Sequence, residues 1–425
     1  MIRTFLLAAL ALGAASAPAS APALADDLVA KGEYLTRAAD CAGCHTVPGS
    51  PMYAGGRAFT LPMGTVHAPN ITPDPKTGIG GYTDEEWLKA LQKGVARDGR
   101  HLYPAMPYAS YTKMSREDAL AIKAYLFSLK PVETVPTPAA TMKFPYDQRW
   151  GLAFWNMVNA PNTRLEPDSA KSAAWNRGAY LVEALGHCGE CHTPRNFMQG
   201  LKDAKAFAGA NQQGWLAYNL SSDKQAGLGG WSDEQLASYL STGQAPGRGP
   251  ASGPMAEVIQ YSLRYLTQDD IKAMVAYLRD RPAQPDGPPA VQGVPKAVAL
   301  SASSGDSPGA HLYNQACAGC HLPDGKGRQS PWAALGGSHS TGDVNGTNLV
   351  QVLAHGSQME TSQGLVFMHS FTGGYSDREL AAIANYTIGQ MSGRQGQVTP
   401  QQIGAARGTD AHKPTDPPPQ VAGLR

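Results

Sequence analysis

Cys41-Ala-Gly-Cys44-His45 is the first of three copies of one five-residue pattern, Cys-x-x-Cys-His. The other two copies are Cys188-Gly-Glu-Cys191-His192 and Cys317-Ala-Gly-Cys320-His321. Together they use all six cysteines, so none is left over for a disulfide. In this pattern the two sulfur atoms bond covalently to haem, and the histidine takes one axial face of the iron. The sequence therefore predicts three covalently bound haem c groups.

A Cys-x-x-Cys pair alone is also typical of a thioredoxin-like redox site or of half of a zinc site. Here each pair carries its own histidine, and no cysteine lies outside the pattern. Three complete copies therefore favour haem over both alternatives. The predicted cofactor-binding cysteines are Cys41, Cys44, Cys188, Cys191, Cys317 and Cys320, and the predicted iron ligands are His45, His192 and His321.

The chain length of 425 residues suits three domains of about 100 residues, one for each haem. Charged residues make up only 16%, and the formal net charge is +1. This composition indicates neither nucleic-acid binding nor a strongly acidic docking surface. The 47 glycines and 33 prolines predict loop-rich domains, in which a porphyrin supplies part of the core.

Residues 1–25 have the pattern of a secretory leader that is cleaved after Ala25. Arg3 precedes a short apolar run, and Ala-Leu-Ala precedes Asp26. The run is too short to span a bilayer comfortably, and no later stretch approaches about 18 uninterrupted apolar residues. We therefore expect an exported, periplasmic chain without a transmembrane helix. Export fits the chemistry, because bacteria attach c-type haem outside the cytoplasm.

The haem motifs lie within a longer repeat. A helical pattern with a glycine precedes each motif, and this glycine would let two helices cross at close range: Gly32, Gly178 and Gly309. A proline follows each haem histidine: Pro48, Pro194 and Pro323. Its turn could aim a backbone carbonyl at the second nitrogen of that histidine, or it could be an ordinary turn proline.

Two further helices are predicted in each repeat from capping residues. The first begins after a polar cap and ends at a glycine, in the pairs Thr83 and Gly94, Ser232 and Gly243, and Asn345 and Gly356. The second begins after Ser115, Thr267 or Ser376 and closes the repeat. Each repeat therefore reads as a small helical domain that is clamped by its first and last helices.

A methionine follows the helix-ending glycine after twelve residues in all three repeats, at Met106, Met255 and Met368. This shared offset predicts that these methionines are the second axial ligands. A thioether raises the reduction potential and closes the iron to substrates, which favours electron transfer over haem catalysis.

Other candidate ligands lack the repeat. Met63 and Met359 have no counterparts, whereas His369 is adjacent to Met368 and could ligate in its place. We expect the remaining histidines to be structural or solvated: His67, His101, His187, His311, His339, His355 and His412.

The expected domain order has seven parts. A leader (1–25) precedes a first haem domain (26–135), an aromatic linker (136–170), a second haem domain (171–283), a Pro/Ala/Ser-rich linker (284–305), a third haem domain (306–393) and a polar, disordered tail (394–425). We call the three haem domains units 1, 2 and 3. The aromatic residues of Phe144–Val158 could pack between units 1 and 2 or form a docking patch for a partner or a membrane. A loop shared by units 1 and 2, starting at Ala68 and Ala217 and containing Asn70 and Asn219, is expected to hold haem propionates.

Over nearly its whole length the sequence resembles the triheme cytochrome c subunits of membrane-bound alcohol, polyol, gluconate and aldehyde dehydrogenases of acetic acid bacteria. The resemblance rests on the three haem motifs, Asn-Ile-Thr-Pro-Asp at 70–74, Tyr-Pro-Ala-Met-Pro-Tyr at 103–108 and the Arg149-Trp…Phe-Trp linker. It implies a mainly α fold of three tandem cytochrome c domains. It also implies a separate quinoprotein, flavoprotein or molybdenum catalytic subunit, with ubiquinone as the electron acceptor.

The chain departs from this family in two places. Its tail lacks an amphipathic anchoring segment, and Met368-His369 replaces the more usual Met-Pro. Three closed haem sites still favour an electron-transfer subunit at the periplasmic face of the inner membrane, with peripheral membrane contact and no nucleic-acid partner. A free periplasmic shuttle or a terminal-oxidase-linked cytochrome is an alternative. A haem peroxidase fits less well because it needs an open iron, and we assign no catalytic residue.

Overall fold

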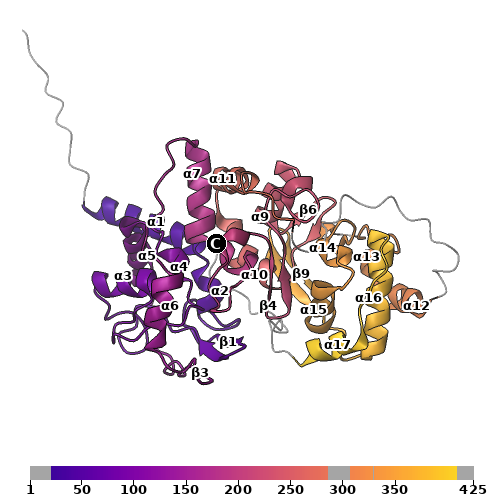
Figure 1. The fold of residues 1–425 in the computed structure, drawn as a ribbon, viewed down its shortest axis with the longest axis horizontal. Helices are drawn as coiled ribbons and strands as arrows, with labels where there is room; N and C mark the ends of the chain where they lie inside the picture. Colours follow the sequence, from indigo (N-terminus) through magenta and orange to yellow (C-terminus); the bar gives the residue numbers. More distant parts are fainter. Residues whose placement is uncertain (1–20, 286–306, 329, 409–425) are drawn as a thin grey trace, which may run out of the picture.

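The computed structural model describes residues 21–285, 307–328 and 330–408, and it is mainly helical (Figure 1). Most of the predicted leader and of the second linker lies outside these residues, as does the end of the tail. No helix in the described ranges is long and apolar enough to cross a membrane.

Unit 1 is built from helices at the indigo end of the chain in Figure 1. They are α1 (Ala21–Ala38), α2 (Cys41–His45), α3 (Asp84–Lys93), α4 (Tyr108–Tyr111) and α5 (Arg116–Ser128). Strands β1 (Ala58–Leu61), β2 (Gly64–His67) and β3 (Thr141–Met142) form one antiparallel sheet. Helix α6 (Gly151–Asn159) follows this sheet and belongs to the linker.

Unit 2 repeats this order of helices. They are α7 (Ala173–Tyr180), a π-helical continuation (Leu181–Leu185), α8 (Gly189–His192), α9 (Asp233–Thr242), α10 (Gly253–Tyr261) and α11 (Gln268–Arg279), with short 3₁₀ turns at Asp203–Lys205, Leu228–Gly230 and Leu263–Tyr265. Its two antiparallel pairs are β4 (Ala210–Gln212) with β5 (Trp215–Ala217), and β6 (Gln244–Ala245) with β7 (Gly249–Pro250).

Unit 3 is the orange-to-yellow part of Figure 1. Its helices are α12 (Pro308–Ala316), α13 (Ala318–His321), a 3₁₀ turn (Pro331–Ala333), α14 (His339–Gly342), α15 (Thr347–His355), α16 (Asp377–Ser392) and α17 (Pro400–Arg407). Strands β8 (Ser357–Thr361) and β9 (Gly364–Met368) form an antiparallel hairpin.

The first and last helices of each unit cross at the predicted glycines. A Cβ atom on Gly32 would lie 1.9 Å from the carbonyl oxygen of Ala121, and one on Gly178 would lie 1.9 Å from that of Ala273. In unit 3 the matching distance from Gly309 is 2.4 Å. Any side chain would push the helices apart, so the expectation that glycine permits close crossing is confirmed in all three units.

The helix caps follow the sequence with one exception. Thr83, Ser232 and Ser376 form capping boxes, whereas Ser115 and Thr267 accept hydrogen bonds from the third residue of their helices. The prediction that Asn345 caps α15 is wrong, because Gly346 occupies the cap position. The carboxylate of Asp343 accepts from the backbone N–H groups of Asn345 and Thr347 instead.

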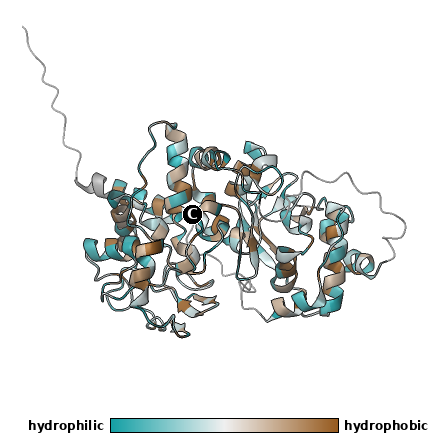
Figure 2. Ribbon diagram, in the orientation of Figure 1, coloured by the Kyte–Doolittle hydropathy of each residue, from teal (hydrophilic) through white to brown (hydrophobic). Residues whose placement is uncertain are grey.

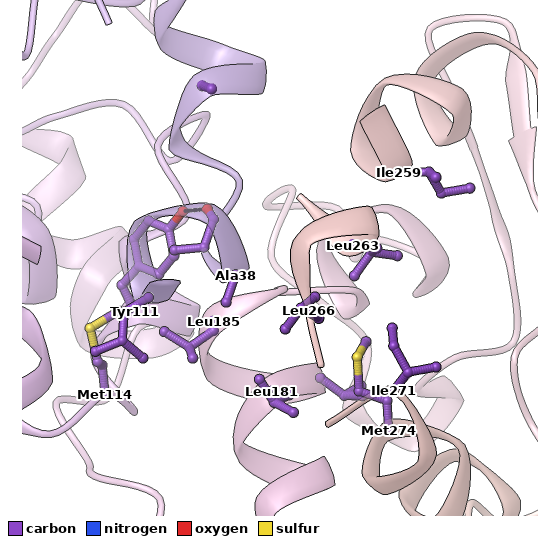
Figure 3. Packing of buried hydrophobic residues seen from close by; sticks show 14 of the residues in the cluster. Ala38, Tyr111, Met114, Leu181, Leu185, Ile259, Leu263, Leu266, Ile271 and Met274 are labelled. Atoms are coloured by element: carbon purple, nitrogen blue, oxygen red, sulfur yellow. Dashed lines mark hydrogen bonds between the residues drawn. The ribbon is translucent and has the colours of Figure 1, made fainter. Parts of the chain in front are cut away.

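The buried side chains form two clusters, although the sequence predicts three units. One cluster joins units 1 and 2 through residues that include Ala38, Tyr111, Leu185 and Met274 (Figure 3). The second cluster joins unit 3 to Val398, Ile403 and Ala406 at the start of the tail. Units 1 and 2 therefore share one hydrophobic core.

A reciprocal pair of tyrosines fixes units 1 and 2 to each other. The Tyr34 hydroxyl of unit 1 donates to Asp270 of unit 2 at 2.6 Å. The Tyr180 hydroxyl of unit 2 donates to Asp118 of unit 1 at 2.6 Å. Each tyrosine follows its crossing glycine by two residues, where unit 3 has His311. This exchange therefore belongs to units 1 and 2 alone.

The expectation of a disordered tail is wrong for its first part. Helix α17 begins with a capping box at Thr399, and Ile403 and Ala406 are buried in the core of unit 3. Arg407 forms an ion pair with Asp377 at the start of α16. Apolar residues at helical spacing within a polar stretch account for this difference.

Candidate haem-binding sites

The three motif histidines share one hydrogen-bonding arrangement. Nδ1 of His45 lies 2.7 Å from the carbonyl oxygen of Pro69, and Nδ1 of His192 lies 2.5 Å from that of Tyr218. Nδ1 of His321 lies 2.7 Å from the carbonyl oxygen of Ala333. A carbonyl accepts only from a protonated Nδ1, so this tautomer leaves the Nε2 lone pair for a metal ion.

The prolines after the motifs do not supply these carbonyls. One predicted source was the turn at Pro48, Pro194 or Pro323. In the structure the acceptor carbonyls belong instead to residues that follow the histidines by 24, 26 and 12 positions. In units 1 and 2 the carbonyl comes from the loop that the sequence assigned to haem propionates. Asn70 and Asn219 in this loop are buried, and their side-chain oxygens accept from the backbone of Thr72 and Ser221. The loop thus orients the histidine.

The motif cysteines are unpaired thiols. Burial raises the pKa of Cys44 and Cys188 to about 12, and that of Cys191 to about 11. Redox-active dithiols instead have a thiol with a lowered pKa. Among the described residues no group of three His, Cys, Asp or Glu side chains is placed to hold a metal ion by itself. The raised pKa values of these thiols therefore do not favour the dithiol alternative.

Comparison with known proteins also favours haem c as the group that these motifs bind. Residues 29–130 match the family model of cytochrome c, and residues 306–387 match that of cytochrome C oxidase, cbb3-type, subunit III. The chain is 37% identical over 406 residues to the fructose dehydrogenase cytochrome subunit of Gluconobacter japonicus, covering 89% of this chain and 82% of that protein. The gluconate 2-dehydrogenase cytochrome c subunit of Pantoea cypripedii is 37% identical over 420 residues, covering 94% of each.

A third relative is the alcohol dehydrogenase (quinone), cytochrome c subunit of Gluconobacter oxydans, which is 36% identical over 395 residues, or 90% of this chain and 82% of that protein. The chain belongs to the family of cytochrome c subunits of dehydrogenases. The predicted family, a mainly helical cytochrome c fold and covalent haem c as the cofactor are thereby confirmed.

This cytochrome c subunit also carries polar groups that fit haem. The Nε1 atoms of Trp215, Trp231 and Trp332 are buried and have no hydrogen-bond partner within the described part of the chain. In unit 1 a cavity of about 350 Å³ is lined by Tyr82, Arg97 and Arg100, with Ala96 and Asp98. Indole N–H and guanidinium groups suit the carboxylates of a porphyrin. Only the three-dimensional structure identifies these groups.

The predicted methionine ligands lie at partly buried positions. Met106 is in the loop before α4, and Met255 is in the first turn of α10; both contact the core shared by units 1 and 2. Met368 ends β9 and contacts the core of unit 3. Their roles as axial ligands stay predictions.

The structure separates these methionines from their competitors. Met63 lies in the turn between β1 and β2. Met359 is buried against unit 2, where its sulfur would lie 2.6 Å from a Cβ atom on Gly243. His369 is exposed, and its ring lies 4.4 Å from that of Phe371. Met359 therefore packs between units 2 and 3.

Proposed function

We propose that this chain is a triheme electron-transfer subunit that accepts electrons from a catalytic dehydrogenase subunit and passes them to ubiquinone. The observation that carries the proposal is the same Nδ1-to-carbonyl arrangement at three complete Cys-x-x-Cys-His motifs. We call these site 1, site 2 and site 3, after their units. The proposed units are residues 26–135, 171–283 and 306–393.

Haem c supplies a one-electron iron couple when it is bound. The chain's own residues would hold it: two cysteines by thioether bonds, a histidine with a fixed tautomer and a methionine opposite. A closed pair of axial ligands favours outer-sphere electron transfer over peroxidase chemistry. The alternatives of a free shuttle and of a terminal-oxidase cytochrome are less favoured, because relatives over most of the chain are named as dehydrogenase subunits.

Contacts between units support a linear order with site 2 in the middle. Ser110 of unit 1 donates at 3.0 Å to Glu190, which lies inside the second haem motif. On the other side, Tyr218, whose carbonyl orients His192, contacts His339 of unit 3 with ring centroids 4.5 Å apart. Site 2 thus has direct neighbours in both other units. Electrons that enter at site 1 or at site 3 would pass through site 2 to reach the other.

The outer face of α6 supports a membrane-facing exit. Trp150 and Phe154 are 68% and 59% exposed, and Met157 and Val158 continue the same exposed stripe. We call these four residues the α6 ridge; hydrophobic residues of this helix are brown in Figure 2. The helix holds no acidic or basic residue, and the segment before it carries Lys143 and Arg149 with one acid, Asp147. Such an apolar stripe, preceded by a segment of net positive charge, suits the interface of a bilayer.

The α6 ridge also lies close to site 1. The Tyr108 hydroxyl, two residues after Met106, donates to Asn156 of α6 at 2.7 Å. The Tyr103 hydroxyl donates to the Tyr146 carbonyl at 3.0 Å. We therefore propose that the chain lies at the periplasmic face of the inner membrane, with site 1 nearest the quinone.

The haem count tests the first part of this proposal. We expect purified protein to give three haems per chain by pyridine haemochrome assay. A Cys188→Ala/Cys191→Ala variant should give two, because its second motif can no longer form thioether bonds. Two haems or fewer in the unaltered protein would overturn the triheme assignment.

The electron path is tested in the assembled complex. We expect the chain to copurify with a catalytic dehydrogenase subunit, and its haem absorbance to show reduction when that enzyme receives substrate. Addition of a short-chain ubiquinone should then reoxidise the haem. Absence of a dehydrogenase partner, or reoxidation only by a soluble oxidase, would favour the shuttle or oxidase alternative.

A further inference from the structure

Site 2 differs from the other two sites in the residue that orients its histidine. The carbonyl acceptor belongs to Pro69 in site 1 and to Ala333 in site 3. In site 2 it belongs to Tyr218, whose aromatic side chain is available for contact with another unit. The position of this carbonyl can therefore depend on what holds the tyrosine ring.

Unit 3 holds that ring through His339 of α14. The two ring centroids are 4.5 Å apart at an interplanar angle of 53°. The Trp231 ring lies on His339 as well, with centroids 5.9 Å apart. Burial lowers the pKa of His339 to about 4, so the ring is neutral at pH 7 and places no charge among the aromatic side chains.

The backbone just before Tyr218 is held by unit 3 too. The Asn348 side chain accepts from the backbone N–H of Leu216 at 2.7 Å and donates to the carbonyl of Leu216 at 2.9 Å. These two bonds satisfy both backbone groups of one residue in β5. Unit 3 thus contacts this segment at two points. Asn348 binds the backbone of Leu216, two residues before Tyr218, and His339 contacts the Tyr218 side chain.

We propose that His339 is a positioning residue for site 2: it fixes Tyr218, and through the Tyr218 carbonyl it sets the hydrogen bond from His192. This inference rests on the proposed haem at site 2. A strong hydrogen bond to Nδ1–H makes the opposite nitrogen a more basic ligand, which favours the oxidised metal and lowers the reduction potential. Docking of unit 3 thereby tunes the site in unit 2.

The experiment compares ring removal with ring replacement in the holoprotein. We expect His339→Ala to shift one of three midpoint potentials upward in a spectroelectrochemical titration, and to leave the other two in place. His339→Phe keeps an aromatic ring and should stay close to the unaltered protein. Electron paramagnetic resonance should show a changed signal for one low-spin haem in His339→Ala only.

Two matched controls separate this role from general loosening. His311→Ala removes an exposed histidine of the same unit, and Met359→Ala loosens the contact between units 2 and 3 at Gly243. Neither should move the site 2 potential. The proposal is overturned if all three potentials of His339→Ala are unchanged, or if Met359→Ala or His339→Phe gives the same shift. A haem count below three in unaltered protein would instead contradict the proposed function.

Discussion

Met106→Ala is expected to remove about a third of the charge-transfer absorbance that His/Met-ligated haem shows, and to lower one of three reduction potentials. The absorbance is lost because it requires the methionine sulfur on the iron. The potential falls because a thioether favours reduced iron, whereas water or an open position does not. Met255→Ala and Met368→Ala should each have the same effect on a different site. Near-infrared absorbance and potentiometric titration of each holoprotein measure it.

Two competing methionines provide the controls. Met63→Ala changes a residue in the β1–β2 turn and should leave all three potentials in place. Met359→Ala removes a buried side chain and is expected to cost about 2–5 kcal/mol of folding stability without loss of the charge-transfer band. The ligand of unit 1 is misassigned if Met63→Ala loses the band and Met106→Ala keeps it. The same comparison between Met359→Ala and Met368→Ala applies to unit 3. If His369→Ala rather than Met368→Ala changes site 3, His369 is its ligand.

The sequence predicted those features that depend on short-range rules. The crossing glycines, the capping boxes and the left-handed caps at Gly94 and Gly243 each require one residue type at a fixed position in a helix. The repeat made them visible three times. Gly356 also ends α15, although its backbone has a positive φ of 78° with an extended ψ of −172°.

Long-range partners were beyond such rules. The Pro69 and Tyr218 carbonyls reach their histidines only because a loop folds back, and nothing in a local pattern marks a backbone oxygen. The Tyr34 hydroxyl meets Asp270, which is 236 residues away. Met359 enters the core of another unit, so its burial could not be read from unit 3 alone. These contacts explain why the sequence described three separate domains, whereas units 1 and 2 share one core.

The structure also divides the aromatic linker, which the sequence could only treat as one segment. Trp155 faces inward: its Nε1 donates to the Met198 carbonyl at 2.7 Å, and its ring lies 6.2 Å from that of Tyr108. It links the loop beside site 1 to the loop after the second haem motif. Trp150 and Phe154 face outward, and their rings contact each other at 6.1 Å. The packing interpretation therefore holds for Trp155, whereas a docking patch at Trp150 and Phe154 stays a proposal.

Trp150→Ala/Phe154→Ala is expected to release the complex from membranes while all three haems remain. If each side chain contributes about 1.5 kcal/mol at the interface, the pair contributes about 3 kcal/mol, or roughly a hundredfold in membrane partition. The measurement is co-sedimentation with phosphatidylethanolamine/phosphatidylglycerol vesicles that contain ubiquinone. Quinone reduction should fall with binding, whereas reduction of a soluble artificial acceptor should not.

Two variants give this test its meaning. Phe367→Ala removes a similarly exposed aromatic side chain from the hairpin of unit 3 and should leave membrane binding unchanged. Trp155→Ala removes the inward ring, so it should destabilise the contact between units 1 and 2 rather than release the complex. An interfacial ridge binds through its apolar area, so Trp150→Phe should keep most of the membrane binding that Trp150→Ala/Phe154→Ala loses. If Trp150→Ala/Phe154→Ala binds membranes fully, or if Phe367→Ala loses as much membrane binding, the α6 ridge is not the membrane contact. Its exposed face would then fit a protein partner instead.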